Sequence, residues 1–504
     1  MNQQNQTPVQ QPEQDLNEIL QIRRDKLAKL VQEGNNPFEV TKFNKTHSSK
    51  QIVENFVDPT DENEHGETVS IAGRMVSRRI MGKASFCHLL DGEGTIQLYV
   101  KRDEIGVEAY QQFKTWDIGD IIGATGYVFR TKMGEISVHV TSLQLLSKSL
   151  LPLPEKFHGL KDIETRYRQR YVDLIANPEV KRTFVIRSGI MKAIREYLDN
   201  LGYLEVETPI LNTIAGGANA RPFITHHNTL DIDMYMRIAT ELHLKRLIVG
   251  GFERVYEIGR QFRNEGMDLR HNPEFTTIEL YQAYTDFEGM MEIAQGLFTY
   301  CADKVLGTRK LPYGDVVIDL DNWQKLSMLQ AVQKYVGVDL SQMDDSQAVE
   351  IAKQKGIDLP EGKRTWGHAL YELFDIFVEK QLIQPTFIYD YPVEVSPLAK
   401  KKPTDGRLTE RFEFFMNASE MGNAFSELND PIDQFERFSA QVKAKAQGDD
   451  EAHMMDEDFI TALEYGMPPT GGLGIGIDRM VMLFTNNQSI RDVLLFPTMK
   501  PLSK

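Results

Sequence analysis

The sequence predicts an α+β protein in which a small closed β-barrel precedes a larger domain built on a mainly antiparallel sheet. About five short strand patterns follow one another between residues 67 and 150, with glycine turns between them, which is typical of a small barrel. Beyond residue 151, helical and strand patterns mix without regular βαβ alternation. That mixture favours a largely antiparallel sheet flanked by helices over a doubly wound fold.

The composition excludes several protein classes. The 504 residues are 41% hydrophobic and 26% charged, which is ordinary for two or three globular domains. Residues 1–14 contain neither Lys nor Arg and predict a disordered Gln-rich tail rather than a targeting peptide. No apolar run is long enough to span a bilayer, and Cys87 and Cys301 form no CxxC pair. We therefore expect a cytoplasmic protein without a membrane partner, a disulfide framework or a thiolate zinc site.

Residues 15–66 are expected to form an N-terminal helical extension. A helix is predicted over residues 15–33 and ends at Gly34. Its arginines and lysines, Arg23 among them, are placed away from an apolar side formed by Leu16, Ile19, Leu20, Leu27, Leu30 and Val31.

Residues 67–150 are expected to form the barrel, and the Leu-Pro-Leu-Pro stretch at 151–154 marks its boundary with the larger domain. The net charge of the chain is −16, which by itself argues against a nucleic-acid partner. The barrel segment differs, since it holds ten Lys and Arg against nine Asp and Glu. Arg74, Arg78, Arg79 and Lys83 lie within ten residues of one another, but a solvated surface is the better interpretation of such a cluster taken alone.

The larger domain, residues 151–504, includes a stretch around 318–385 that reads as a helical insertion. Earlier, residues 184–209 predict a core helix, with Gly202 at its C-terminal end and an edge strand after it that runs into Pro209.

Residues 255–284 predict two strands joined by a polar loop. On the returning strand, a period of two places Phe275, Thr277, Glu279 and Tyr281 on the face opposite the aliphatic residues. A structural strand seldom sets a glutamate among aromatics, so this face is interpreted as the wall of a ligand site. Arg263 and Glu265 share a face on the preceding strand, and a guanidinium suits a phosphate or carboxylate.

Two further segments carry candidate chemistry. Residues 471–483 match neither GxGxxG nor the Walker pattern, and they predict a glycine-rich strand that admits a close neighbour, followed by a helix with Arg479 in its first turn. An arginine there is unfavourable for the helix dipole unless it faces an anion. Residues 411–430 predict a hairpin turning at Asn417-Ala418, which puts Glu413 and Glu420 on one face, close enough to share a divalent cation.

Together these segments resemble the class II aminoacyl-tRNA synthetases, specifically the lysine branch of the aspartate/asparagine/lysine subgroup. Residues 184–209 resemble the dimerisation motif of that family. Phe262-Arg263-Asn264-Glu265 with Phe275 matches its second motif, and Gly474-Ile475-Gly476-Ile477-Asp478-Arg479 matches its third. The hairpin turn departs from the family, where two glycines are common in place of Asn417-Ala418.

The resemblance implies an OB-fold that binds the anticodon of tRNA(Lys), a catalytic domain that activates L-lysine with ATP and Mg²⁺, and a homodimer. Arg263 is expected to hold the α-phosphate and Arg479 the γ-phosphate. Phe275 is expected to stack on adenine, and Glu413 and Glu420 to bind magnesium. Two residue sets complete these sites: Glu265, His271 and Asn272 line the ATP site, and Gly217, Glu241, Asn423, Gly474 and Gly476 join the lysine site.

Lysine specificity follows in part from the residues themselves, since an ammonium side chain requires buried carboxylates. Glu279 and Glu427 are placed for that role, with Tyr281 beside them. In the barrel, the family assigns base contacts to Phe86, Gln97 and Glu135, with Phe86 stacking on an anticodon base. Without the resemblance, Phe86 reads as barrel core.

Three alternatives remain open. A lysyl transferase acting on protein would lack the barrel. An aspartyl or asparaginyl enzyme would disagree with Glu279 and Glu427. A non-catalytic paralogue used for RNA or protein binding is expected to have lost Arg263, Glu413, Glu420 or Arg479, and this chain retains all four.

Overall fold

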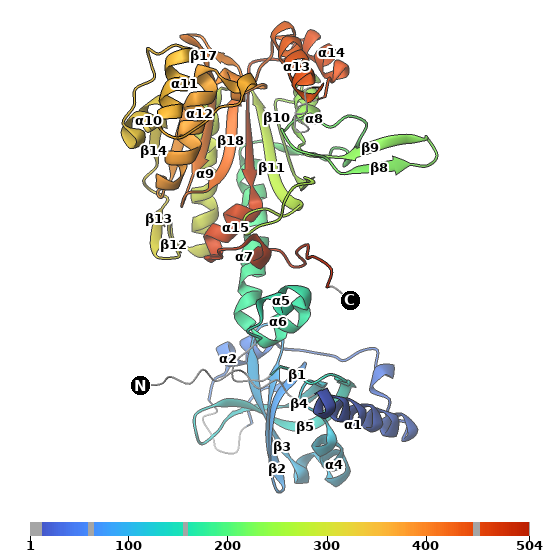
Figure 1. Ribbon diagram of the computed structural model, residues 1–504. Coiled ribbons are helices and arrows are strands. Elements are labelled where there is room, and N and C mark those ends of the chain that lie inside the picture. Colours follow the sequence, from blue (N-terminus) through green and yellow to red (C-terminus); the bar gives the residue numbers. More distant parts are fainter. Residues whose placement is uncertain (1–12, 59–64, 155–159, 447–453, 503–504) are drawn as a thin grey trace, which may run out of the picture. The chain divides into compact units, whose positions relative to one another are not determined.

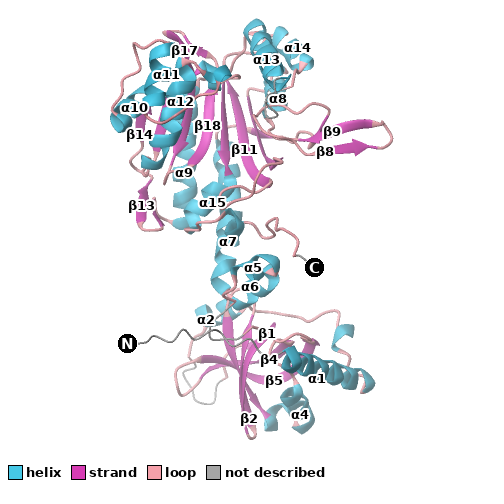
Figure 2. Ribbon diagram, in the orientation of Figure 1, coloured by secondary structure: helices cyan, strands magenta, loops and turns pink. Residues whose placement is uncertain are grey.

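The computed structural model describes residues 13–58, 65–154, 160–446 and 454–502, and the chain divides into two compact units, residues 1–161 and 162–504. The predicted Gln-rich tail lies almost wholly outside the described residues. Figures 1 and 2 show the helices and strands of both units. The first unit has a hydrophobic cluster of its own, and the second unit has several. None of the described helices is both long and apolar enough to cross a membrane.

The first unit contains a closed barrel with the strand order β1-β2-β3-β5-β4, which confirms the predicted barrel. Its strands are β1 (Thr68–Met81), β2 (Ala84–Leu90), β3 (Thr95–Lys101), β4 (Ile121–Arg130) and β5 (Ile136–Ser147). All neighbours pair antiparallel except β3 and β5, which pair parallel. Along β2, Cys87 and Leu89 are buried in the barrel core, while Phe86 and His88, which alternate with them, are half-buried and point outward.

Helix α1 (Glu13–Gln32) confirms the predicted N-terminal helix, and Gly34 ends it with a φ of +74°. The predicted division of its sides is wrong in part. Leu16 and Val31 are exposed, whereas Arg23 is buried and donates to three backbone carbonyl oxygens of the same unit. A guanidinium with several donors can satisfy carbonyls that an aliphatic side chain cannot.

Short helices also occur in the first unit: η1 (Pro37–Glu39), α2 (Ser49–Asn55), α3 (Arg102–Ile105) and α4 (Val107–Thr115). Helix α4 was not predicted. Its Tyr110 and Phe113 are buried in the barrel core, so the connection between β3 and β4 covers apolar residues of the barrel.

The second unit is built on a nine-stranded sheet, with β14-β15-β17-β18-β19-β11-β10-β6 in order and β16 beside β17. The sheet is antiparallel except at its two edges, where β14 pairs parallel with β15 and β6 with β10. Its strands are β6 (Leu204–Glu205), β10 (Arg254–Phe262), β11 (Glu274–Ala283), β14 (Gln324–Ser327), β15 (Thr386–Pro392), β16 (Lys401–Lys402), β17 (Asp405–Phe415), β18 (Glu420–Ser426) and β19 (Thr470–Gly476). The smaller sheets comprise β7 (Leu211–Asn212), β8 (Ile224–His227) and β9 (Ile232–Met236), and β12 (Lys310–Tyr313) and β13 (Val316–Asp319).

Helices cover both faces of this sheet (Figure 1). The main cluster packs α7 (Pro178–Asn200), α9 (Phe287–Leu306) and α15 (Ile477–Thr485) against one face. On the other face, α10 (Met328–Val336), α11 (Asp345–Gln354) and α12 (Trp366–Phe377) pack near β15. Helices α8 (Glu241–Val249), α13 (Pro431–Ala446) and α14 (Glu457–Glu464) pack near β11. The space between these two groups of helices leaves the middle of the sheet open.

Two predictions about local structure can be compared with this fold. Helix α7 ends at Gly202, whose φ is +79°, and β6 is an edge strand, as predicted for residues 184–209. The stretch 318–385 contains α10, α11 and α12, but its first residues belong to β13 and β14 rather than to helices. Because β14 is a four-residue edge strand that pairs parallel, it has no local periodicity from which it could be predicted.

Candidate active site

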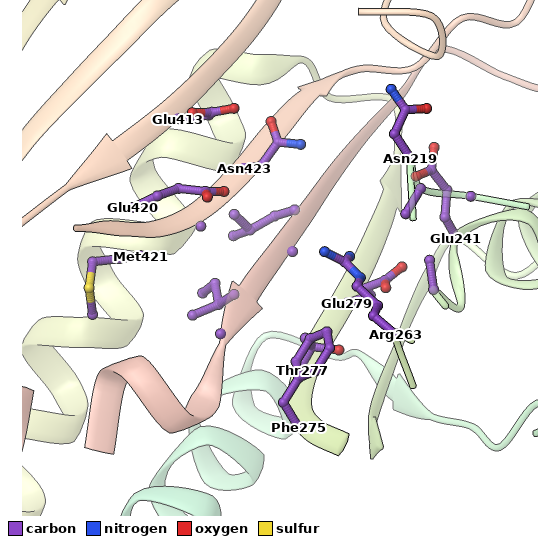
Figure 3. Close-up of a pocket in the computed structure, with 18 of the residues that line it drawn as sticks. Asn219, Glu241, Arg263, Phe275, Thr277, Glu279, Glu413, Glu420, Met421 and Asn423 are labelled. Carbon is purple, nitrogen blue, oxygen red and sulfur yellow. The ribbon is translucent and has the colours of Figure 1, made fainter. Parts of the chain in front are cut away.

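A cavity of about 500 Å³ lies in the second unit, over strands β11, β18 and β19 (Figure 3). Every residue that the sequence analysis assigned to the ATP, lysine and metal sites lines it. Figure 3 shows Glu413 and Glu420 at one side of the cavity, and Glu241 with Asn219 at the opposite side. The fold therefore gathers residues that stand more than two hundred positions apart in the sequence.

Strand β11 forms one wall, as predicted. Phe275, Thr277, Glu279 and Tyr281 line the cavity, whereas the aliphatic residues between them are buried in the main core. Antiparallel pairing with β10 on one side and β19 on the other holds this strand in register.

Arg263 and Arg479 both line the cavity. The Arg263 guanidinium lies over the Phe275 ring, 5.1 Å from its centroid, and burial lowers the pKa of that guanidinium. Arg479 donates from Nη1 to the backbone oxygen of Glu420 at 2.6 Å. Two guanidinium groups on one cavity suit a ligand with several negative charges.

The loop between β10 and β11 supplies the remaining predicted ATP contacts. His271 pairs with Asp268, with 2.8 Å between Nδ1 and Oδ2. Asn272 is buried, and its Nδ2 donates to the backbone oxygen of Glu274 at 2.7 Å. Glu265 is exposed at the cavity mouth.

The glycine-rich segment is a strand, β19, that leads into α15 with Arg479 in the first turn, as predicted. A Cβ at Gly472 would overlap Glu427 Oε1 and the ring of Tyr281, so only glycine fits beside these groups. At Gly474 and Gly476 a Cβ would meet no atom closer than 3.8 Å. Gly474 and Gly476 therefore leave open space at the floor of the cavity rather than form a loop around a phosphate.

The predicted hairpin forms between β17 and β18. It turns at Asn417 and Ala418, both with positive φ (49° and 52°), and Met416 and Ser419 pair across the turn. Glu413 accepts from Tyr391 Oη at 2.9 Å and from Arg411 Nη2 at 2.6 Å. Burial, and secondly the charge of Glu420, raise the pKa of Glu413 to about 7.

These two carboxylates fit a divalent cation. A bound cation would remove the repulsion between the Glu413 and Glu420 carboxylates. Magnesium is commonly coordinated by one or two protein carboxylates, and phosphate and water oxygens complete its coordination shell. Among the described residues, no group of three or more His, Cys, Asp or Glu side chains is placed to hold a metal. A magnesium ion here must therefore share its coordination with a ligand in the cavity.

Three further carboxylates line the cavity: Glu241 and Glu427, which are buried, and Glu279, which is half-buried. Burial, and secondly the charge of Glu241, raise the pKa of Glu279 to about 7. Glu279 accepts from the backbone nitrogen of Thr240 at 3.1 Å and from Tyr281 Oη at 3.4 Å. Gly217, with a φ of +90°, leaves room beside Glu241, and Asn423 accepts from Arg411 Nε at 3.0 Å.

Three charged residues at this site were not predicted. Arg270 and Arg411 line the cavity, and Lys245 pairs with two of its carboxylates. A period of two along β17 puts Arg411 on the same face as Glu413, so Arg411 could have been predicted from the sequence. Lys245 follows Glu241 by four residues, a spacing that usually indicates a surface ion pair.

In the first unit, the outer face of the barrel carries an aromatic patch, defined here as Phe86, Tyr99, Tyr127, Phe129 and His139. Each is half-buried, and neighbouring ring centroids lie 4.6–6.0 Å apart. Phe86 belongs to this outer face and not to the barrel core, so the core interpretation is wrong. Beside the patch, Gln97 Nε2 donates to Glu135 Oε2 at 2.7 Å.

Comparison with known proteins identifies the class. Residues 162–500 match the family described as tRNA synthetases class II (D, K and N), and residues 69–146 match the OB-fold nucleic acid binding domain. The chain belongs to the class II tRNA synthetases of this group.

Its relatives narrow the assignment. The chain is 60% identical over 490 residues to the lysine–tRNA ligase of Thermoanaerobacter sp. (strain X514), covering 97% of both chains. It is 57% identical over 491 residues to the lysine–tRNA ligase of Bacillus subtilis (strain 168), covering 97% of this chain and 98% of the relative. Within its class, the chain belongs to the lysine–tRNA ligases.

Proposed function

We propose that this protein activates L-lysine with ATP to form lysyl-adenylate and transfers the lysyl group to the 3′ end of tRNA(Lys), releasing pyrophosphate and AMP. The observation that carries the proposal is the set of charged groups gathered in one cavity. Arg263 and Arg479 line it together with Glu241, Glu279 and Glu427. The guanidinium groups suit a triphosphate, and the carboxylates suit an amino acid with two ammonium groups.

The reaction requires no nucleophile from the protein. The lysine carboxylate attacks the α-phosphorus and pyrophosphate leaves, so the protein contributes orientation and charge neutralisation. Arg263 holds the α-phosphate, Arg479 the γ-phosphate, and Phe275 stacks on adenine beside Glu265, His271 and Asn272. Glu413 and Glu420 hold Mg²⁺, which when bound neutralises phosphate charge.

Lysine is held by carboxylates at both of its ammonium groups. Glu241 binds the α-ammonium, with Gly217 and Asn423 beside it. Glu279 and Glu427 bind the side-chain ammonium, Tyr281 orients Glu279, and Gly474 and Gly476 leave room for the substrate. An aspartyl or asparaginyl enzyme requires cationic or neutral groups around the substrate side chain. The carboxylates of Glu241, Glu279 and Glu427 therefore disfavour aspartate and asparagine as substrates.

The barrel unit serves tRNA. Phe86 in the aromatic patch stacks on an anticodon base, and Gln97 and Glu135 read base edges, because single-stranded nucleic acid binds OB-folds through stacking on aromatics. We further propose a cytoplasmic homodimer that uses α7 and the strand after it as its interface, where Val185, Leu204 and Leu211 are exposed in the single chain.

Exchange of radioactive pyrophosphate into ATP tests the central proposal. With Mg²⁺ and without tRNA, exchange is expected to depend on lysine, because every group assigned to adenylate formation lies in the second unit. Exchange stimulated by aspartate or asparagine, and not by lysine, would exclude the assignment.

A further inference from the structure

Lys245 is a fully buried lysine placed between two carboxylates of the proposed lysine site. Its Nζ contacts Glu241 Oε1 at 2.5 Å and forms a direct ion pair with Glu427 Oε2. The side chain has no exposed surface and does not line the cavity. Lys245 thus lies behind the wall that Glu241 and Glu427 present to a ligand.

The position of this ammonium is tightly restricted. Lys245 follows Glu241 by one helical turn on α8, and its Nζ lies 5.4 Å from the Phe425 ring centroid and 5.9 Å from that of Phe459. Aromatic rings attract a cation and also block its movement. The first turn of α8 and the end of β18, 186 residues apart in the chain, are therefore linked through one ammonium group.

Glu427 keeps capacity for a ligand. Glu427 gives Oε2 to Lys245, while its buried Oε1 has no hydrogen-bond partner among the described residues and lies against Gly472. A buried carboxylate oxygen without a donor is costly unless a ligand supplies one. The cavity thus offers Oε1 of Glu427 as an acceptor for a substrate ammonium.

Several cations act on these carboxylates. Lys245 acts on Glu241 and Glu427, Arg411 also acts on Glu241, and Arg263 acts on Glu279. Burial raises the pKa of Glu241 and of Glu427, and the Lys245 ammonium opposes that rise.

We propose that Lys245 is a specificity-determining positioning residue: by holding Glu241 and Glu427 on one ammonium, it fixes the separation of the two substrate-binding carboxylates and so selects the side-chain length of lysine. The inference rests on the proposed function, in which these carboxylates bind the two ends of the substrate. Ornithine, shorter by one methylene, can reach both carboxylates only if their separation can change.

The test uses the full-length protein with Lys245→Met, which keeps an unbranched side chain of similar volume and removes the charge. Pyrophosphate exchange is measured with lysine and with ornithine, and KM and kcat are determined for each and for ATP. Arg246→Met is the matched control on the same helix, because its guanidinium pairs with Asp456 and Asp458 instead. Lys245→Gln is a second variant, which retains N–H donors and so perturbs folding less.

In Lys245→Met, the lysine KM is expected to rise about a hundredfold, since removing one member of a buried ion-pair cluster leaves unpaired charge. The KM for ATP should stay within about threefold. The ratio of kcat/KM for ornithine to kcat/KM for lysine should rise by about tenfold or more, because one methylene changes discrimination in kcat/KM by roughly one to two decades. Lys245→Gln should shift both quantities in the same direction, and Arg246→Met should leave the ratio unchanged.

Three outcomes separate the proposals. A folded Lys245 variant with an unchanged lysine KM and ornithine ratio would overturn the positioning role. A lowered melting temperature with unaltered selectivity would show Lys245 to be structural and would overturn it as well. If the wild-type protein shows no lysine-dependent exchange, the proposed function itself fails.

Discussion

Arg187 and Asp478 form a partly buried ion pair, with 2.6 Å between Nη1 and Oδ1, that joins α7 to the first turn of α15. The second carboxylate oxygen of Asp478 accepts from the backbone nitrogen of Thr276 at 2.7 Å, and Arg187 Nη2 donates to the hydroxyl of Thr276 at 3.1 Å. The core helix, the cavity wall and the arginine-bearing helix thus meet at one cluster. The carboxylate also lies at a helix N-terminus, where negative charge is favoured.

Asp478→Ala is expected to lower the free energy of unfolding of the second unit by roughly 3 kcal/mol, because it leaves a guanidinium and a backbone N–H without their partner. Urea unfolding measures this loss. The control is Glu196→Ala, which breaks an exposed pair with Lys304 and should cost less than about 1 kcal/mol. Equal losses in both variants would show that the buried cluster adds nothing.

Glu427→Gln is expected to depress kcat/KM for lysine by about two to four decades, because a neutral amide leaves both Lys245 and the substrate ammonium without a full charge partner. The KM for ATP should change little, since Glu427 is not among the residues proposed to contact ATP. Steady-state pyrophosphate exchange provides both values. A loss below tenfold would remove Glu427 from the lysine site.

Lysine binding is expected to weaken as the pH falls through 7. The pKa of Glu279 is raised to about 7, so below that pH a proton occupies the carboxylate that the substrate ammonium requires. Between pH 8 and pH 6 the lysine KM should rise roughly tenfold for one proton in competition with substrate.

Glu279→Gln is the control, with a higher lysine KM that varies less over this range. The pH dependence of stability gives a second comparison. Because the pKa of Glu279 is raised in the folded state, the free energy of unfolding of the wild-type protein should fall as the pH rises from the unfolded-state pKa of this carboxyl to about 7. In Glu279→Gln the amide does not titrate, so this decline should be absent. A wild-type lysine KM independent of pH would contradict the assignment.

Ala418→Gly is expected to stabilise the second unit by roughly 0.5–1 kcal/mol. Ala418 has a φ of 52°, which is strained for a residue with a Cβ, and the relief exceeds the extra entropy of glycine in the unfolded chain. Asn417→Gly at the adjoining position should change little, because asparagine tolerates this conformation. Thermal unfolding compares the two variants, and a lower melting temperature for Ala418→Gly would refute the strain argument.

Local periodicity was sufficient to predict the cavity wall on β11, the β17–β18 hairpin and Arg479 in the first turn of α15. Each depends on a repeat or a turn within about thirty residues of sequence. Lys245 could not be predicted in the same way. Its Glu-Lys spacing on α8 is the one that marks solvated helices, and its burial depends on Glu427, which arrives from another strand.

The aromatic patch illustrates a similar limit. Phe86 and Tyr99 lie on successive strands, and they can be recognised as outward residues only once the barrel register is known. Phe129 on β4 and His139 on β5 lie on the same face. Helix α4 was missed because its residues show no clear start signal, and Gly106 precedes it with a φ of +91°. Pairing between distant strands therefore decided the aromatic patch, whereas α4 lacks a local signal.

Phe86→Ala is expected to weaken aminoacylation of tRNA(Lys) by roughly ten- to a hundredfold, because stacking of a base on an aromatic ring is worth about 1–3 kcal/mol. Lysine-dependent pyrophosphate exchange should hardly change, since that chemistry lies in the second unit. Phe86 is half-buried on the outer face, with its ring centroid 4.9 Å from that of Tyr99, so its removal costs little folding energy.

Phe113→Ala is the matched control in the same unit. Phe113 is buried in the barrel core, so its truncation should lower the melting temperature, with roughly 3–5 kcal/mol lost from that unit. A Phe86 variant that melts like Phe113→Ala would be a stability mutant. A stable Phe86 variant with unaltered aminoacylation would place anticodon recognition elsewhere on the barrel. Loss of aminoacylation alone, in a protein that still exchanges pyrophosphate, is the result that stacking requires, because that pattern separates tRNA recognition from lysine activation.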